Sequence, residues 1–256
     1  MNFQNAIILF ISGAVGGALN AVAGGGSFVS FPALLFVGVP PIPANATNTI
    51  ALWLGAAASG GAYRERLNIP KKILIPLIGA SLVGGLGGAI LLLKTPGHTF
   101  LEILPWLSLG ATLLFVFGKK IAGKRRSSMG RDSTQSAIIG GTIFQFMVAV
   151  YGGYFGGGMG IVMLAMLAML GMSDIHDMNA LKSVMGFVIN GVAVVAFVVA
   201  GAVYWRAGLY SIVGAVAGGY FGAHYALKVP QAWVRGFVIF SGFAMTVYFF
   251  CKGYGG

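Results

Sequence analysis

The chain has 256 residues, of which 57% are hydrophobic and only 8% charged, and its mean hydropathy is +0.89. Soluble domains carry about 25% charged residues, so this composition excludes an ordinary soluble domain and indicates a polytopic membrane protein. The net charge of +11 does not indicate nucleic-acid binding, because the lysines and arginines form short clusters between apolar runs. Such clusters mark cytoplasmic loops, so the expected partner is a lipid bilayer and no nucleic acid is expected.

Ten apolar segments follow one another along the chain. In the first half they lie at about residues 5–23, 27–39, 46–63, 73–93 and 101–118. In the second half they lie at about residues 136–155, 159–171, 183–203, 208–227 and 234–251. The longer runs approach the ~20 apolar residues that cross a bilayer, and they do not alternate as the strands of a membrane barrel do. Because lipid offers the backbone no hydrogen bonds, the segments are predicted to be helices.

The second segment of each half is too short to cross a membrane as a helix. Twelve or thirteen helical residues cover about 18–20 Å, whereas the hydrocarbon core is about 30 Å thick. Each short segment follows three consecutive glycines, so we expect a half-helix, a re-entrant piece or a short embedded span. The predicted fold is therefore all-α and polytopic, with eight to ten membrane segments and broken or re-entrant segments after the Gly-rich breaks.

One long pattern occurs twice. The run "AGGGSFVSFPALLFVGVPPIPANATN" at Ala23–Asn48 has the same order of features as "FGGGMGIVMLAMLAMLGMSDIHDMNALK" at Phe155–Lys182: three glycines, a short apolar run, another glycine and then Asn-Ala. We interpret the chain as a duplicated membrane unit, with a first repeat at 1–118, a basic cytoplasmic linker at 119–135 and a second repeat at 136–256. The positions of the basic residues do not decide whether the two repeats are inverted or parallel.

A second pair of glycine-rich blocks supports the duplication. The block "GASLVGGLGG" at Gly79–Gly88 aligns without a gap with "GAVAGGYFGA" at Gly214–Ala223, so that Gly84 matches Gly219. Both blocks belong to stripes with small-xxx-small spacing, which let helix backbones approach closely in lipid. We expect the stripes to pack helices inside the molecule, and a homodimer face or a pore-lining stripe is the alternative.

Polar residues beside the glycine breaks are the candidates for substrate binding. They are Gly24, Gly25, Gly26, Asn45, Thr47 and Asn48 in the first half and Gly156, Gly157, Gly158, Asn179, Lys182 and Ser183 in the second. Three glycines let the backbone turn sharply and approach a ligand. Asn45 and Asn179 stand where helices are expected to start, and a helix start carries a partial positive charge that suits an anion.

Two such helix starts facing each other, with the full positive charge of Lys182, would make an anion site like those of secondary transporters. Asn48 and Lys182 align, so the two copies differ in charge at this place. The plain alternatives are close packing of the glycines, capping by Asn45 alone and snorkelling of Lys182 to an interface.

Asp174, His176 and Asp177 resemble a small acid–base or metal cluster. The matching place in the first half holds prolines, Pro40 and Pro41 among them, so we expect a solvated loop. Proton coupling through His176 or Asp174 is the alternative, and neither a metal site nor a cofactor is expected.

The four tryptophans mostly lie near segment ends. They are Trp53, Trp106, Trp205 and Trp233. Tryptophan is enriched where a membrane meets water, so interfacial anchoring is the expected role.

Three stretches resemble the TauE/SafE sulfite exporter family over nearly the whole chain: "GGGSFVSFPALLFVGVPPIPANATN", "GGYFGGGMGIVMLAMLAMLGMSDIHDMNALKSV" and "WRAGLYSIVGAVAGGYFGAHYALKVP". The resemblance implies a multi-pass carrier with two repeats in the inner membrane of a bacterium or archaeon. It also implies sulfite, sulfonates or other small organosulfur anions as substrates. It supplies no binding residues, so the candidate residues above rest on the physical argument.

The expected function is therefore a secondary transporter that exports a small anion, coupled to protons or to the membrane potential. No G-x-x-x-x-G-K-[ST] motif for ATP binding occurs. A membrane assembly factor without transport activity is the first alternative. An integral-membrane enzyme is a weaker one, because His98, His176 and His224 lie in separate regions and form no metal-ligand spacing.

Overall fold

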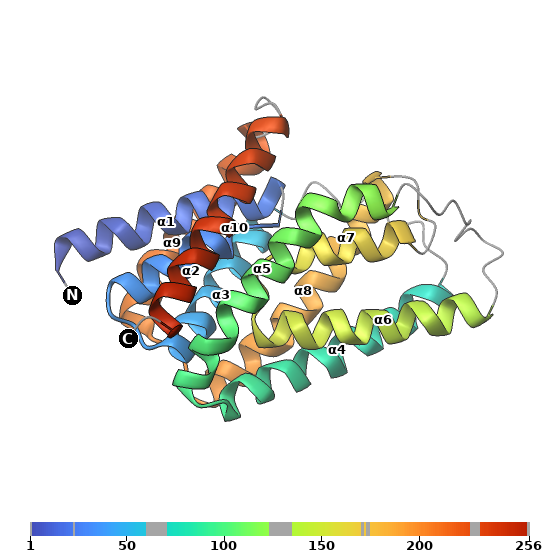
Figure 1. Cartoon of the computed structure of the whole chain (residues 1–256), viewed down its shortest axis with the longest axis horizontal. Helices are drawn as coiled ribbons and strands as arrows, with labels where there is room; N and C mark the ends of the chain where they lie inside the picture. Colours follow the sequence, from blue (N-terminus) through green and yellow to red (C-terminus); the bar gives the residue numbers. More distant parts are fainter. Residues whose placement is uncertain are drawn as a thin grey trace.

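The structure is a computed structural model that describes residues 2–22, 24–59, 71–122, 135–169, 172, 175–225 and 231–254. This described part contains ten α helices and no strand. The first half holds α1 (Phe3–Val22), α2 (Ser27–Phe36), α3 (Pro41–Ser59), α4 (Lys71–Lys94) and α5 (Gly97–Ala122). The second half holds α6 (Gln135–Tyr154), α7 (Met159–Met169), α8 (Ile175–Val199), α9 (Trp205–Tyr225) and α10 (Gln231–Tyr254) (Figure 1). The all-α prediction is confirmed, and each helix overlaps one predicted segment.

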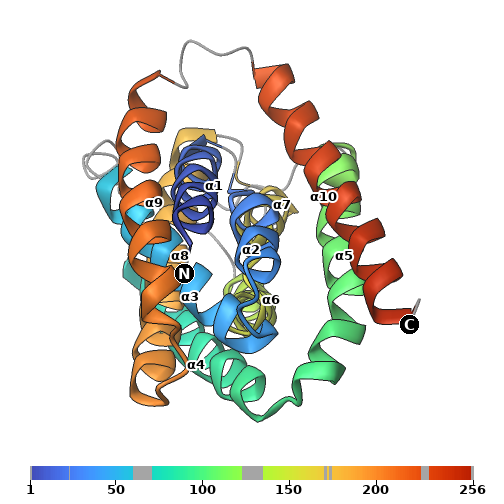
Figure 2. The ribbon, with the colours of Figure 1, turned by 90° about the vertical axis from the view of Figure 1, so that its left-hand side faces the viewer.

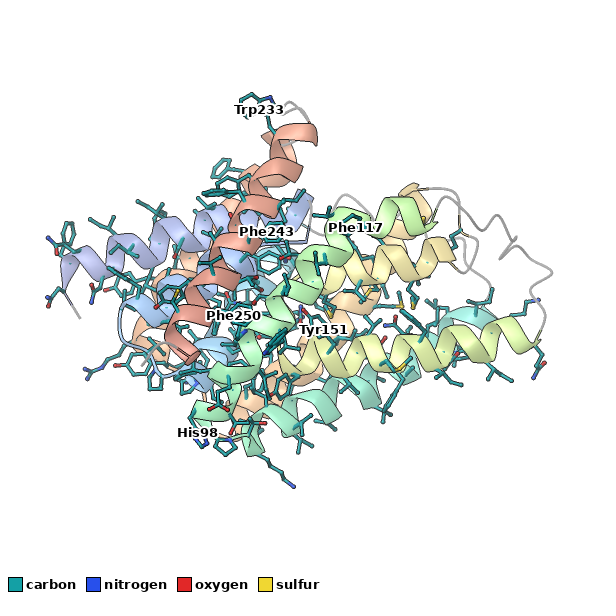
Figure 3. The ribbon with its side chains drawn as sticks, in the orientation of Figure 1. His98, Phe117, Tyr151, Trp233, Phe243 and Phe250 are labelled. Atoms are coloured by element: carbon teal, nitrogen blue, oxygen red, sulfur yellow. The ribbon has the colours of Figure 1, made fainter. Side chains whose placement is uncertain are left out.

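The helices are those of a polytopic membrane protein, as the composition predicts. Among the described residues, Phe3–Ala21, Lys71–Lys94 and Leu181–Val199 are long and apolar enough to cross a membrane. Shorter apolar stretches lie in α2, α6 and α10. Large apolar side chains such as Phe117 and Trp233 are exposed on the outside of the bundle (Figure 3). A surface of this kind suits contact with lipid rather than with water.

The two short helices begin directly after the glycine breaks. α2 has 10 residues and α7 has 11, and at a rise of about 1.5 Å per residue neither exceeds roughly 17 Å. Gly24 and Gly156 adopt φ angles of +77° and +73°, in a region that residues with side chains rarely enter. Beyond its break α2 turns back along α1, because Gly16 lies against both Gly26 and Ser30. The short segments and the breaks before them are therefore as predicted.

Helices α3 and α8 begin earlier than the sequence suggested. α3 starts at Pro41 and α8 at Ile175, so Asn45 and Asn179 lie inside helices and their predicted place at a helix start is wrong. The prolines explain the first case, because proline is favoured in the first helical turn, where its missing N–H is not needed. The N–H of Ala44 already donates to the carbonyl oxygen of Pro40 at 2.8 Å. The helix starts beside the glycine breaks are instead those of α2 and α7.

The fourth helix of each half packs mainly against helices of the other half. α9 packs along α1 and α3, α4 packs along α6 and α8, and α5 packs against α10 (Figure 2). This pattern is unchanged when each helix of one half is exchanged for its counterpart in the other, as a duplicated unit would require. The repeat boundaries at residues 118 and 136 stay a prediction. Of the predicted linker, residues 119–122 belong to α5, residues 123–134 lie outside the described part, and residue 135 is the first of α6.

The packing also sets the register between the two repeats. Gly218 lies against Ala14 of α1, and Gly84 lies against Phe146 of α6, at the corresponding place. Gly84 is thus equivalent to Gly218, and its predicted match with Gly219 is wrong by one residue. When two glycines are adjacent in both blocks, the sequence allows either alignment. The correct one is the alignment in which the matched glycines face the equivalent neighbouring helix. These stripes pack helices inside the molecule, which was the expected role.

The two halves run in opposite directions. Gly24, which follows the C-terminal end of α1, lies against Gly160 at the start of α7, the helix that follows α6. Figure 1 shows α1 reaching this point from the left, where the N-terminus lies, and α6 reaching it from the right. The two halves are therefore arranged as inverted repeats would be, an alternative that the basic residues of the sequence left open.

Candidate functional site

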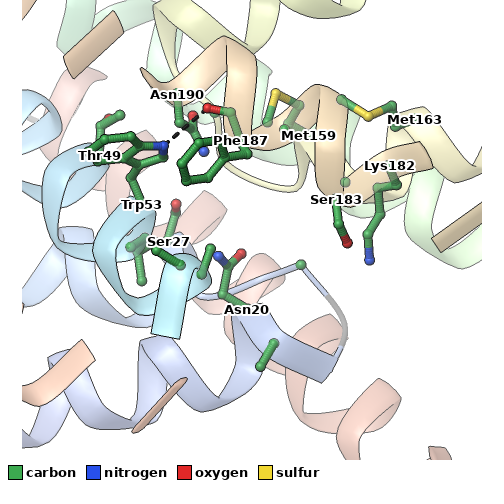
Figure 4. A pocket seen from close by; sticks show the side chains of 18 of the residues that line it. Asn20, Ser27, Thr49, Trp53, Met159, Met163, Lys182, Ser183, Phe187 and Asn190 are labelled. Atoms are coloured by element: carbon green, nitrogen blue, oxygen red, sulfur yellow. Dashed lines mark hydrogen bonds between the residues drawn. The ribbon is translucent and has the colours of Figure 1, made fainter. Parts of the chain in front are cut away.

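A cavity of about 610 Å³ lies where the glycine breaks meet α3 and α8. Its polar lining includes Asn20, Ser27, Thr49, Lys182, Ser183 and Asn190, and its apolar lining includes Trp53, Phe155, Met159, Met163 and Phe187 (Figure 4). Pockets for small molecules have volumes of about 300–1,000 Å³ and mostly apolar walls with a few polar groups. The cavity therefore has the size and the lining of a ligand site.

The cavity lies between the two halves of the chain, near the axis that relates their equivalent helices. Equivalent residues line it in pairs: Gly24 and Gly156, Ser27 and Met159, Thr49 and Ser183, and Trp53 and Phe187. The last two residues touch each other, with ring centroids 5.0 Å apart and 29° between the ring planes. Equivalent residues can touch only close to the axis. The two inverted halves therefore contribute to one shared site.

The Trp53–Phe187 pair is held in place by more than stacking. The indole N–H of Trp53 donates to the carbonyl oxygen of Phe187 at 3.1 Å. Gly191 lies beside the indole, where a Cβ would come within 3.5 Å of a ring carbon. The expected role of Trp53 as an interfacial anchor is therefore wrong, because its ring lines the cavity.

Lys182 is the one residue with a formal charge among the described residues that line the cavity. Its stem passes Gly160, at which a Cβ would lie 3.3 Å from Cδ of Lys182. Gly160 in turn faces Gly24, at which a Cβ would lie 3.5 Å from Cα of Gly160. Gly160 in α7 thus leaves room for the lysine, and Gly24 of the first break packs on its other side. Figure 4 shows Lys182 and Ser183 projecting from α8 toward the side of the cavity where Asn20 lies.

Asn48, the equivalent of Lys182 in the first repeat, is buried among hydrogen-bond partners. Its Nδ2 donates to Oγ of Ser27 at 3.2 Å, and its Oδ1 lies 2.5 Å from Oγ of Ser30. Both serines belong to α2, so Asn48 ties the start of that helix to α3. At the equivalent positions of α7 the second repeat has Met159 and Val162. The two repeats therefore differ in chemistry at the same place.

Asn45 and Thr47 also bond within the protein. Nδ2 of Asn45 donates to the carbonyl oxygen of Tyr154 at 3.1 Å, and Oγ1 of Thr47 accepts from the N–H of Tyr204 at 2.9 Å. Both bonds join α3 to the second half of the chain. Neither residue lines the cavity, and neither does Asn48. The structure thus separates these three candidates from Lys182 and Ser183.

Of the remaining candidate residues, some line the cavity and others do not. Gly24 and Gly156 line the cavity. The other four glycines pack against neighbours or bond to them: Gly25 against Val238, Gly26 against Gly16, Gly158 against Ala111, and Gly157 through its carbonyl oxygen to the hydroxyl of Tyr151. Asp174 lies outside the described residues, and so do the side chains of His176 and Asn179.

The backbone at Gly24 gives a stability prediction. We expect Gly24→Ala to destabilise the protein by about 1–2 kcal/mol, since a Cβ disfavours this left-handed conformation and the space beside Gly24 would itself admit one. Thermal unfolding in detergent should show a melting temperature lower by roughly 2–8 °C. Gly110→Ala is the control, because Gly110 is helical and has no neighbour within 4 Å of a Cβ. Equal melting temperatures for the two variants would contradict the strain at Gly24.

Sequence reasoning missed the aromatic part of the site. It did not include Asn20 or Asn190 among the candidate residues, and it assigned Trp53 to an interface. The equivalence of Asn48 with Lys182 also makes Trp53 equivalent to Phe187. Two aromatic residues at equivalent positions beside the proposed site were the available signal.

Comparisons with known proteins agree with the geometry. The family model "Sulfite exporter TauE/SafE" matches residues 9–249. A "Probable membrane transporter protein" of Haemophilus influenzae is 31% identical over 241 residues, covering 93% of this chain and 92% of the relative. "Probable membrane transporter protein ORF9" of Sinorhizobium sp is 26% identical, covering 96% and 92% of the two chains. "Probable membrane transporter protein YfcA" of Escherichia coli K12 is 24% identical, covering 93% and 87%.

Proposed function

The chain belongs to the sulfite exporter TauE/SafE family of membrane transporters, and we propose that it carries a small anion through the cavity at Lys182. The anion we propose is sulfite or an organosulfur anion such as a sulfonate, and the direction is export. The observation that carries this proposal is the single formal charge in the described lining of a cavity to which both halves of the chain contribute. Ionisable groups inside a membrane are costly, so such a residue is a candidate for function.

The side chains that line the cavity suit the binding of an anion. The ammonium group of Lys182 supplies charge, and the hydroxyl of Ser183 and the amide of Asn20 can each donate a hydrogen bond from nearby positions in the lining. Hydrogen bonds to a charged group contribute about 1.5–3 kcal/mol. A lining with a positive charge and hydrogen-bond donors suits an anion with several acceptor oxygens, such as sulfite or a sulfonate.

The inverted repeats support transport through the same site. In many secondary transporters the substrate lies between inverted repeats, and rocking of one repeat against the other exposes the site to each side in turn. The cavity lies between two halves of the chain that we interpret as repeats of this kind, beside two broken segments at Gly24 and Gly156. We propose that gradients drive the transport. We also propose the inner membrane of a bacterium or archaeon as the location, because its spans are helices and not the strands of outer-membrane barrels.

The test is transport by purified protein in liposomes. Lys182→Met is expected to lower the uptake or efflux of labelled sulfite or methanesulfonate at least about tenfold, since it removes a charged hydrogen bond of ~1.5 kcal/mol or more. Lys94→Met, at the exposed end of α4, is the matched control and should transport at the rate of the unmodified protein. Unchanged transport by Lys182→Met would show that the anion does not bind at this lysine.

A further inference from the structure

We propose that the cavity is open toward the cytoplasm in this structure, and that α2 and the first turns of α3 form a seal on the outer side. This inference rests on the proposed function, and it concerns access to the cavity and not the ligand. The cytoplasmic end is the one where α4 begins, at Lys71 and Lys72, because basic residues gather on the cytoplasmic side of membrane proteins.

The direction of α4 ties that end to one end of the second half. Gly84 of α4 lies against Phe146 of α6, and Gly88 lies against Val150, so the two helices run in the same direction. Figure 1 shows both of them starting on the right. The first half runs the other way, so the same end of the bundle holds the first turns of α8 and the last turns of α3.

The cavity reaches from the middle of the bundle toward this end. On α3 the residues that line it begin at Thr49 and continue to Ala58, one residue before the helix ends. On α8 they begin at Lys182 and stop at Asn190, although the helix continues to Val199. Because α3 and α8 run in opposite directions, both stretches lie on the cytoplasmic side of the stacked rings near the axis.

The two short helices take unequal parts in the lining. Three residues of α7 line the cavity, Met163 among them, whereas of α2 only Ser27 does. The equivalent of Met163 is Phe31, which is fully buried and packs on the rings of Phe100 in α5 and Phe249 in α10. Inverted repeats exchange their roles when access changes sides, so this inequality is what a state open to one side has.

Two hydrogen bonds hold the first turns of α3 to the second half of the chain. Oγ1 of Thr47 accepts from the N–H of Tyr204, which directly precedes α9, at 2.9 Å. Nδ2 of Asn45 donates to the carbonyl oxygen of Tyr154 at 3.1 Å. Both side chains of α3 are at most 1% exposed. With Phe31 they make up the outer seal, and opening the cavity to the outside requires α3 to leave Tyr204.

Val184 and Ile50 are a matched pair of reporters for the two sides. The alignment of Asn48 with Lys182 makes Ile50 the equivalent of Val184. Val184 is half-buried and lines the cavity, whereas Ile50 is 4% exposed and does not. When the halves exchange their roles, Ile50 takes the place of Val184 in the lining of a cavity that is open to the outside.

The experiment is cysteine labelling from each side of the membrane. Val184→Cys and Ile50→Cys are made in a Cys251→Ser background, because Cys251 is the one cysteine of the chain and is exposed. A membrane-impermeant maleimide is added to spheroplasts, which expose the outer side, or to inside-out vesicles, which expose the cytoplasmic side. We expect Val184→Cys to react at least about tenfold faster in the vesicles, since the open state is the main population. Ile50→Cys should react slowly in both.

A change at Thr47 should shift access to the outer side. Thr47→Val keeps the branched shape and removes the acceptor for the N–H of Tyr204. We expect Ile50→Cys to react about threefold faster in spheroplasts when Thr47→Val is added, a factor that the loss of one hydrogen bond can give. Thr47→Ser keeps the acceptor and should leave the rate unchanged. Thr112→Val is the matched control, because Thr112 is also buried but bonds to Ser108 of its own helix.

The outcomes separate this inference from the proposed function. Faster labelling of Val184→Cys from the cytoplasmic side, with the rise for Ile50→Cys in Thr47→Val, supports the inference. Equal labelling of Val184→Cys from both sides, or faster labelling from outside, overturns it. No rise in Thr47→Val, or an equal rise in Thr112→Val, overturns the role of Thr47 in the seal. If Thr47→Val does not fold, the comparison of Val184 with Ile50 decides alone. The proposed function depends instead on transport by Lys182→Met, which does not enter these rates.

Discussion

Gly88→Ala is expected to prevent stable assembly of the helix bundle, whereas Gly87→Ala, one residue earlier, is expected to be tolerated. A Cβ on Gly88 would overlap the carbonyl oxygen of Val150 in α6, and a Cβ on Gly87 has no heavy atom within 4 Å. Gly218→Ala should behave like Gly88→Ala, because a Cβ there would overlap the carbonyl oxygen of Ala14. The crossing of α4 with α6 and the equivalent crossing of α9 with α1 are thus each tested once.

The size of the stability loss depends on the atoms that Gly88 and Gly218 face. Overpacking a core costs about 1–3 kcal/mol when side chains can move aside. Here the obstacle is backbone on a neighbouring helix, so we expect a loss of more than ~3 kcal/mol. Close approach of backbones also supplies much of the packing energy between membrane helices, and a forced separation would lose it along the whole crossing.

Size-exclusion chromatography and thermal unfolding in detergent measure this effect. We expect Gly88→Ala and Gly218→Ala to give little monodisperse protein, or a melting temperature lower by roughly 6–12 °C. Gly87→Ala should change stability by less than ~1 kcal/mol, since alanine is the better helix former. If Gly87→Ala and Gly88→Ala had the same melting temperature, the close crossing of α4 with α6 would be contradicted.

Much of the fold could be predicted because the signals are local. Long apolar runs end at basic clusters, prolines or glycines, so every described helix overlaps a predicted segment. The breaks before α2 and α7 were predictable for a similar reason, since three glycines followed by a short apolar run leave too few residues for a full span. The early start of α3 at Pro41 was missed because the prolines were interpreted as a loop and not as a first helical turn.

The missed features depend on contacts between distant parts of the chain. Gly84 can be aligned with Gly218 or with Gly219 on sequence alone, and only contact with Ala14 or Phe146 decides. The direction of the second repeat was open for the same reason. Polar residues posed a similar problem: Asn48 and Lys182 align, but the sequence does not say that two serines bond Asn48 or that Lys182 lines the cavity.

Asn48 and Lys182 stand at equivalent positions, and substitutions there should have different effects. Asn48→Ala is expected to destabilise the ligand-free protein by about 2–4 kcal/mol, because it leaves a void and removes the buried partner of Ser27. Lys182→Met, at the equivalent position, should change the stability of the ligand-free protein by less than ~1.5 kcal/mol, because an unbranched apolar chain fills most of the same space beside Gly160. Thermal unfolding without and with a bound anion measures both.

Asn48→Ala should lose stability and keep its response to the anion, whereas Lys182→Met should keep its stability and lose that response. An anion that raises the melting temperature of the unmodified protein should still raise that of Asn48→Ala, since Asn48 does not line the cavity. The same anion should not raise the melting temperature of Lys182→Met. If both variants were equally unstable without ligand, Lys182 would be a packing residue like Asn48. If both lost the response to the anion, the site would extend to Asn48 and beyond the cavity that the structure describes. The predicted result would mean that, after duplication, one copy of this position kept the fold together and the other took up the ligand.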